Sequence, residues 1–432
     1  MNDNPKFVKE TLLNIVRSMD NDKSRFVRNP EKDFTRRRTL DFQTMIKFIL
    51  SAGSNALATE IMNFFDFSRF PSVSAFVQQR EKILPEAFYH LLIEFNRQMP
   101  VSPKLFRGYR LLAVDGSDLT LPFNPDEPEN IRTKEHCNFL HLNTLYDVCS
   151  RLFPDASFFT GSKGGEASVA ADMIRALPEK YPVILLADRG YENYNLFANA
   201  EERLFDYVVR IKDTDSTGIM SGINLPDTQE FDIEKRIVIT RHSTGPAAVM
   251  PQIYKSLSKS ARFDFIENSK SPDYEITIRF VRFQLDNGQF EVLATSLPKE
   301  TFSAEDLKEI YHIRWNIETA YLLSKWAMGM ASYHSKKADS IKEVYAELVM
   351  YNFVMYICME LNTEGRGRKH PQQINFTQAI KICLHFFKHT QTMQTYDVEA
   401  TILKFLLPVR CNRSYPRKVV SPSVVGFNYR LA

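Results

Sequence analysis

The chain has 432 residues, and its 55 Lys and Arg against 52 Asp and Glu leave a formal net charge of only +3, which excludes a wholly basic nucleic-acid-binding tail. Because 44% of the residues are hydrophobic and 25% are charged, we expect a folded protein with a buried core rather than a disordered or fibrous chain. The most apolar stretch, residues 348–359, is shorter than the about 20 residues of a membrane span, and the five cysteines form no CxxC pair, so we expect a soluble cytoplasmic protein without a disulfide framework.

The amino-terminal region, residues 1–105, is predicted to be helical and to carry a basic cluster. Residues 22–38 contain seven Lys and Arg against three acidic residues, and they end in Arg36, Arg37 and Arg38. Helical periodicity then follows, with Ser72 as one N-cap, in segments 40–50, 56–65, 73–84 and 86–97. Short helices after an arginine cluster are typical of a DNA-binding unit. A helical dimerisation or packing region with a solvated basic face fits the same pattern.

Residues 106–212 alternate between predicted strands and helices. Two short apolar runs, 111–114 and 182–187, end in Asp115 and Asp188, as buried strands do when they deliver a side chain at their ends. Further strands are predicted at 140–148, 152–159 and 207–211, and helices at 167–177 and 195–202. This order predicts an α/β domain in which helices cover a mixed or mostly parallel sheet.

Residues 213–289 are predicted to be a β-rich insertion in this α/β domain. Period-two alternation indicates strands at 231–240, 262–266 and 274–285. The sequence Asp286-Asn287-Gly288 is a two-residue hairpin signal that leads into a strand at 290–297.

The rest of the core, residues 290–345, is predicted to contain one long helix from 304 to about 330. Ser303 is its expected N-cap, and Glu305 and Asp306 place negative charge in the first turn, where the helix dipole favours it. The segment 346–432 is expected to be a helical carboxyl-terminal region with a basic tail at 410–418. One helix is predicted at 341–360, across the boundary between the core and this region, and another at 376–389.

One face of the predicted long helix carries residues that suit phosphate chemistry. Tyr311, Arg314, Glu318 and Lys325 have offsets that place them within roughly 60° of one another at about 100° per residue. A carboxylate flanked by groups that bind phosphate oxygens suits a helix that holds a metal ion beside a nucleic-acid backbone. A solvated face with Arg–Glu pairing is the alternative for this helix considered alone.

The two strand-end aspartates favour the first interpretation. If Asp115 and Asp188 lie side by side and Glu318 approaches from the helix, they offer the oxygen ligands that a hard divalent cation prefers. Two such ions can activate a nucleophile and stabilise the leaving oxygen. The pattern therefore predicts metal-dependent phosphodiester chemistry.

These residues resemble the motifs of a transposase family. Residues 311–318 with Lys325 match the Tyr-x2-Arg-x3-Glu-x6-Lys signature of bacterial insertion-sequence transposases of the family four type. Asp115-Gly116-Ser117 and Asp188-Arg189-Gly190-Tyr191 are similar to the surroundings of that family's first two catalytic aspartates. The resemblance covers about residues 110–325, and residues 34–38 and 71–84 look like the family's amino-terminal region.

The resemblance implies an RNase-H-like catalytic core interrupted by a β-rich insertion, with Asp115, Asp188 and Glu318 as a DDE triad that holds Mg²⁺, for which Mn²⁺ can substitute. The 130 residues between the second and third triad members leave room for that insertion. It further implies that Tyr311, Arg314 and Lys325 hold phosphates of the transposon end.

At the level of function, the resemblance implies a DNA transposase that binds the terminal inverted repeats of its insertion sequence, cleaves phosphodiester bonds and joins the 3′ ends to target DNA. Its expected partners are transposon-end DNA and target DNA, its expected assembly is a homodimer in the synaptic complex, and its expected location is the bacterial nucleoid.

Two alternatives stay open. A domesticated transposase would bind DNA without cutting it. A phosphatase with a strand-borne aspartate fits less well, because its second aspartate should follow Asp115 by two residues, whereas Asp118 follows by three. The strand-transfer route is also open. Relatives that cut through a DNA hairpin can use a tryptophan of the insertion to hold a flipped base, whereas the tryptophans of this chain, Trp315 and Trp326, lie outside it. We interpret the following residues as structural rather than as metal ligands: Asp147, Cys383, His385 and His389.

Overall fold

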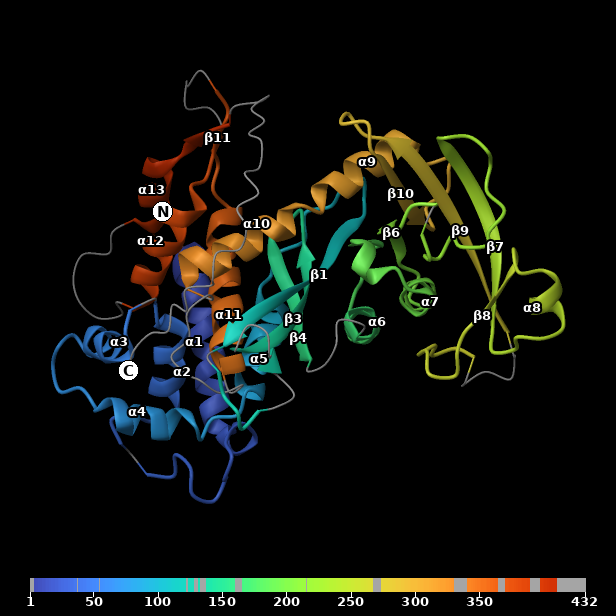
Figure 1. Cartoon of the computed structure of the whole chain (residues 1–432). Helices are drawn as coiled ribbons and strands as arrows, with labels where there is room; N and C mark the ends of the chain where they lie inside the picture. The colour runs from blue at the N-terminus through green and yellow to red at the C-terminus, as the bar shows by residue number, and fades with distance from the viewer. Residues whose placement is uncertain are drawn as a thin grey trace. The chain divides into compact units, whose positions relative to one another are not determined.

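The computed structural model describes residues 4–36, 38–53, 55–121, 123–127, 131–132, 137–159, 165–214, 216–266, 273–329, 340–363, 370–388 and 397–409. Arg37, His389 and the basic tail from residue 410 lie outside the described residues. The described residues form a mixed α/β protein with one large mixed sheet (Figure 1), which confirms the predicted fold class at this level. The chain divides into two compact units. The first unit comprises Met1–Val101, Asp118–Leu140 and Thr319–Ala432, and the second comprises Ser102–Ser117 and His141–Glu318.

The first unit is mainly helical and is organised around α11 (Ile341–Met359). This helix is buried along nearly its whole length and packs against α5 (Glu86–Gln98), α2 (Phe42–Ser51) and α12 (Phe376–Lys388). Its polar Asn352 is fully buried and donates from Nδ2 to Asn96 Oδ1 at 2.9 Å, so the amide is not stranded in the apolar core. None of the helices in the described ranges is long and apolar enough to span a bilayer.

Most of the predicted amino-terminal helices are confirmed, and one helix was not predicted. Ser72 caps α4 by accepting a hydrogen bond from the Ala75 backbone N–H, as expected. The helix α1 was missed because its start is polar, although its buried residues Val8, Leu12 and Ile15 recur at helical spacing. The remaining elements of this unit are α1 (Asn4–Asn21), α3 (Leu57–Phe64), α4 (Val73–Arg80), α13 (Val398–Ile402), β2 (Ile131–Arg132), β11 (Gln372–Gln373) and β12 (Leu407–Pro408).

The second unit contains most of the large sheet. The strand order runs β3-β1-β5-β6-β10-β9-β7-β8, and β4 also pairs with β3. Its strands are β1 (Arg110–Leu121), β3 (Cys137–Asp147), β4 (Leu152–Phe159), β5 (Val183–Ala187), β6 (Asp206–Ile211), β7 (Phe231–Thr240), β8 (Tyr254–Ser256), β9 (Asp273–Gln284) and β10 (Phe290–Thr295). The division between the units falls within β1 and β3.

The centre of this sheet is parallel and buried. β1, β5 and β6 run in the same direction, whereas β3 and β4 form an antiparallel pair. α6 (Glu166–Ala176) and α7 (Tyr194–Glu202) pack against each other and share one apolar core with the sheet. α9 (Ala304–Ile313) packs against β6 on the other side (Figure 1). A parallel sheet needs such cover, because its strands are apolar on both faces.

The segment predicted as a β-rich insertion forms strands that lengthen the core sheet. β9 pairs antiparallel with both β10 and β7, and β10 pairs with β6 of the parallel centre. The strand predicted at 262–266 does not form, and the short β8 was not predicted. The period-two pattern has another cause: Phe263 is buried in the core, while Arg262 and Asp264 pair with each other on the surface of α6 and α7.

The predicted hairpin between β9 and β10 is confirmed, but its loop is longer than two residues. Strand pairing ends at Gln284 and Phe290, and Leu285 N–H donates to Gln289 O at 2.8 Å. Gly288 closes the turn by donating to Leu285 O and has a φ of +82°, in the left-handed region that glycine adopts without strain.

The predicted single helix over 304–330 is wrong in its continuity. The Ser303 cap is present as a capping box with Asp306, but α9 ends at Ile313. Arg314 and Trp315 form a tighter turn, in which each backbone N–H bonds the carbonyl three residues earlier. α10 (Asn316–Leu322) then follows, and a π-helical segment, Leu323–Met328, comes after it.

A buried charge pair anchors the segment that leads into α9. Arg279 on β9 is 2% exposed, and its guanidinium donates to both carboxylate oxygens of Asp232 at 2.8 and 2.9 Å. Its Nη1 donates to the carbonyls of Leu297 and Phe302, directly before α9, at 3.1 and 2.7 Å. One side chain therefore holds two strands and the start of the helix that leads toward Glu318.

We predict that Arg279→Met lowers the free energy of unfolding by about 3–5 kcal/mol, because Asp232 and two carbonyls lose their buried partner. The matched control is Arg236→Met, which removes an exposed ion pair with Glu275 between β7 and β9 and should cost no more than about 1 kcal/mol. Urea unfolding followed by circular dichroism measures both. Equal losses in the two variants would contradict the anchoring role.

Candidate functional site

The register of two parallel strands brings the two predicted aspartates to one edge of the sheet. β1 pairs with β5 up to Val114 and Ala187, and Asp115 and Asp188 are the next residue on each strand. Because parallel strands deliver consecutive positions to the same edge, the aspartates are neighbours there. The prediction that this strand ends at Asp115 is wrong. β1 continues to Leu121, because β3 lies along its other side.

Glycines next to the aspartates hold the two carboxylates. Asp115 Oδ1 accepts a hydrogen bond from the Gly116 backbone N–H at 2.9 Å. Asp188 Oδ1 accepts one from Gly190 at 2.8 Å and thereby caps the short turn that follows β5. These backbone donors fix the side chains before any ligand binds.

Glu318 lies in the first turn of α10 and is paired with Arg314. Arg314 Nη2 lies 3.4 Å from Glu318 Oε1, and the Arg314 side chain is buried while that of Glu318 is about a third exposed. The tight turn at Arg314 and Trp315 places this arginine between two helices rather than in a regular one. A buried guanidinium beside a carboxylate is a strong charge-assisted contact.

The charges of Asp188, Glu318 and Arg314 all act on the pKa of Asp115. Burial raises the pKa of Asp115 to about 7, and the negative charges of Asp188 and Glu318 push the pKa in the same direction. The Arg314 guanidinium and the Gly116 N–H oppose this shift. A carboxylate with such a pKa is typical of a functional site. The structure thus places Asp115 within electrostatic reach of Asp188, Glu318 and Arg314, which the sequence analysis had grouped.

Two buried polar atoms of the same cluster have no hydrogen-bond partner among the described residues. They are the hydroxyl of Tyr311 and the Nε of Arg314. The Arg314 guanidinium carbon lies 5.3 Å from the centre of the Tyr311 ring, so the two side chains pack against each other. Unpaired buried donors are rare in proteins, and they are the groups that a phosphate oxygen would satisfy.

The described residues include no group of three or more His, Cys, Asp or Glu side chains arranged to hold a metal ion. The available ligands are nevertheless chemically suited to Mg²⁺, because Asp115, Asp188 and Glu318 all offer carboxylate oxygens. In the present arrangement Glu318 faces Arg314, whereas the two aspartates are adjacent at the strand edge.

Lys325 lies in the π-helical segment, on the other side of the division between the two units from Glu318. The prediction that it shares a face with Tyr311, Arg314 and Glu318 assumed one regular α-helix. The turn after Ile313 and the π-helix both change the angle per residue, so the sequence offsets no longer define a common face.

Sequence reasoning missed two polar residues of β3 that face the Asp115 end of β1. Asn143 is fully buried, and its Oδ1 accepts a hydrogen bond from the Tyr191 hydroxyl at 2.6 Å. His141 lies two residues earlier, and a Cβ on Gly116 would come within 2.8 Å of its Nε2 and 3.3 Å of Asn143 Oδ1. The available signal was that His141 and Asn143 are polar residues at alternate positions, which place their side chains on the same face of the strand.

The residues interpreted as structural have structural contacts. Asp147 is fully buried and binds Arg110 Nε at 2.7 Å and the Ser150 backbone N–H at 2.8 Å. Cys383 lies in the core of α12, while His385 is on its exposed side.

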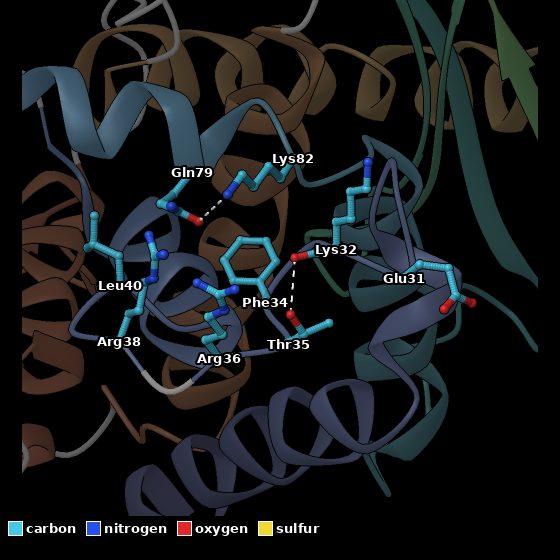
Figure 2. A pocket seen from close by; sticks show the side chains of 9 residues that line it. All are labelled: Glu31, Lys32, Phe34, Thr35, Arg36, Arg38, Leu40, Gln79 and Lys82. Atoms are coloured by element: carbon cyan, nitrogen blue, oxygen red, sulfur yellow. Dashed lines mark hydrogen bonds between the residues drawn. The ribbon is translucent and has the colours of Figure 1, made fainter.

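A second candidate site lies in the first unit, where the basic cluster lines a pocket of about 230 Å³. Figure 2 shows Arg36, Arg38 and Lys82 around the ring of Phe34, with Lys82 Nζ bonded to Gln79 Oε1 at 3.1 Å. Among the described residues, Arg36 and Arg38 have no acidic partner. The full lining is Glu31, Lys32, Phe34, Thr35, Arg36, Arg38, Leu40, Gln79 and Lys82.

The raised pKa of Asp115 predicts a pH dependence of stability in the metal-free protein. Between its ordinary pKa of 3.8 and about 7, the folded chain keeps a proton that the unfolded chain loses, so stability falls as pH rises through this range. From about pH 5 to about pH 8 the loss should be about 2–3 kcal/mol. Asp115→Asn removes it.

Unfolding in the presence of a chelator at both pH values measures this effect. The control is Asp286→Asn at the exposed hairpin, which should keep the parent's pH slope. If Asp115→Asn also keeps the parent's slope, the burial of an ionised Asp115 does not destabilise the fold.

One comparison with known proteins identifies a family over the segment that contains this site. The model of the transposase DDE domain family matches residues 106–353, which contain Asp115, Asp188 and Glu318. Among solved structures, the chain is similar to the piggyBac transposase in its synaptic complex with hairpin DNA, at 11% identity and a TM-score of 0.46 over 93% of this chain and 81% of that chain. The comparison with curated proteins found no match. Because the family match spans more than half of its residues, the chain belongs to the transposase DDE domain family.

Proposed function

We propose that this chain is an active DNA transposase in which Asp115, Asp188 and Glu318 form the catalytic triad. The observation that carries the proposal is the pairing of β1 with β5, which makes the two aspartates neighbours within the segment that matches the family. Glu318 supports it, because its charge acts on Asp115 and it completes the Tyr-x2-Arg-x3-Glu part of the signature.

The proposed catalytic core is RNase-H-like. The strand order β4-β3-β1-β5-β6, with an antiparallel β3–β4 pair, parallel β1, β5 and β6, and helices α6 and α7 over one face, supports this proposal. β7, β8 and β9 would then be the insertion between the second and third triad members, built as an extension of the core sheet.

The proposed cofactor is Mg²⁺, with Mn²⁺ able to replace it. When bound, a divalent cation would lower the pKa of a water or 3′-hydroxyl and stabilise the leaving oxygen of a phosphodiester. Asp115 and Asp188 would hold it from the sheet edge, and Glu318 would join them from α10. Asp115 must give up its proton to act as a ligand, because its pKa of about 7 leaves it partly protonated at neutral pH.

Tyr311 and Arg314 are proposed to bind phosphate oxygens of the transposon end. Each has a buried donor without a partner among the described residues, and Arg314 already lies beside the carboxylates. Lys325 is proposed to contact a neighbouring phosphate on the strength of the signature that it completes. The proposed substrate is the element's terminal inverted repeats, and the product is a strand joined to target DNA.

The basic pocket of the first unit is proposed as a further DNA contact. Arg36 and Arg38, with Arg37 between them in the sequence, offer guanidinium groups that suit phosphate oxygens. The finer features of the proposal, namely the insertion sequence family four type, the homodimer in the synaptic complex and the bacterial nucleoid location, rest on the resemblance of the motifs.

A non-cutting, domesticated DNA-binding protein is the second candidate function. The phosphatase alternative is removed by membership of the DDE family. The retained carboxylates favour cutting over mere binding, because Asp115, whose pKa is raised to about 7, destabilises the fold when it ionises and so has a cost without a function. A divalent-dependent nicking assay on the element's own ends separates the two candidates.

We predict that Asp115→Asn, Asp188→Asn and Glu318→Gln each abolish cleavage of labelled inverted-repeat DNA and leave end binding largely intact. Each removes a ligand charge without removing the proposed phosphate contacts. The control is Asp172→Asn on α6, which pairs with Arg175 and Arg262 and should cut like the parent. Substantial Mg²⁺-dependent nicking by any one triad variant would remove that residue from the triad.

We predict that replacing Arg36 and Arg38 by Ala weakens DNA binding and lowers the slope of log K against log salt by about 1.8, since each phosphate contact contributes about 0.9. Adding Arg37→Ala should lower it further. The control is Arg97→Ala, because Arg97 is already paired with Glu94 and should not change the slope. Fluorescence anisotropy at several salt concentrations measures this. An unchanged slope in the double variant would show that the cluster is a solvated face.

A further inference from the structure

A fourth acidic side chain lies beside the two strand-end aspartates. Glu166 is the first residue of α6, and its side chain is 15% exposed. A Cβ placed on Gly190 would lie 3.4 Å from Glu166 Oε2 and 3.0 Å from Asp188 Oδ1. The two carboxylates therefore face the same small space, which the glycine leaves without a side chain.

His141 lies beside the other oxygen of this carboxylate. Its Nε2 lies 2.9 Å from Glu166 Oε1, and its ring packs edge-on against Phe159 at 4.7 Å. The same Nε2 lies next to Gly116, which follows Asp115. His141 thus lies between Gly116, which follows Asp115, and the Glu166 carboxylate, which faces Asp188.

Glu166 has hydrogen-bonding capacity that its described neighbours do not fill. Within the described residues, Glu166 has His141 as its partner and no Lys or Arg. Its Oε2 faces the space at Gly190, and a carboxylate oxygen there can accept hydrogen bonds from a ligand.

An independent polar group points to the same place. Asn143 is fully buried, and within the described part of the chain its Nδ2 has no hydrogen-bond partner. Its Oδ1 is bonded to Tyr191 of the turn after Asp188 and lies next to Gly116. A donor and a carboxylate that both lack full partners beside the two aspartates are what a hydrated ligand would satisfy.

We propose that Glu166 is a further residue of the reaction centre, that it accepts hydrogen bonds from the water ligands of the divalent cation at Asp115 and Asp188, and that His141 positions it. Mg²⁺ keeps several of its waters in proteins, and carboxylates that bind such waters tune the affinity of the ion. This inference rests on the proposed function, because it requires the cation site at the strand edge.

The test measures Mn²⁺ binding to the full-length protein without DNA, by the electron paramagnetic resonance signal of the free ion. Glu166→Gln keeps the size of the side chain and removes its charge, so we expect an affinity about tenfold weaker than that of the parent. Asp172→Asn removes a charge from the same helix, where it pairs with Arg175 and Arg262, and should leave the affinity unchanged. Thermal unfolding without metal checks that each variant folds.

His141→Gln tests the positioning role separately. It should weaken Mn²⁺ binding in the parent but add nothing in the Glu166→Gln background, since His141 acts through that carboxylate. A further loss in the double variant would overturn the positioning role.

Two outcomes separate this inference from the proposed function. If Glu166→Gln binds Mn²⁺ like the parent while Asp188→Asn loses affinity, Glu166 only secures α6 to β3 and the inference fails alone. If Asp188→Asn also binds like the parent, the proposed cation site fails and the inference fails with it.

Discussion

Parallel pairing between β1 and β5 is the constraint on which the candidate site depends. It places Asp115 and Asp188 one step beyond a pair of matched buried residues, Val114 and Ala187. Because side chains alternate along a strand, a shift of one residue in this register would turn one carboxylate to the opposite face of the sheet. The buried apolar positions on both strands hold the register, so the hydrophobic core and the acidic edge are set by the same contacts.

One buried arginine balances part of the negative charge at the acidic edge. Arg314 lies beside Glu318 and lowers the pKa of Asp115, although burial and the other carboxylates still raise that pKa to about 7. This arginine lies in the tight turn between α9 and α10, so a local irregularity of the backbone coincides with a charge that acts on the site.

Elements far from the site fix its geometry through the sheet. β9 and β10 extend the parallel centre, and Arg279 on β9 binds the segment just before α9. The helix that leads to Glu318 therefore starts from a position that the extended sheet determines. The strands predicted as an insertion are thus continuous with the core sheet and support the start of α9.

The sequence by itself determined the local elements around the candidate site. The apolar runs that precede Asp115 and Asp188 and the Ser303 cap are encoded within short windows, and the structure contains them as predicted. The catalytic roles of Asp115, Asp188 and Glu318 stay predictions. Only the tertiary structure decided which polar residues join them. His141 and Glu166 meet through the pairing of β3 and the packing of α6, and the break after Ile313 arises in a segment whose helical pattern continues unbroken. Contacts between residues distant in the chain leave no periodic signal, because periodicity reports one element's burial and not its partners.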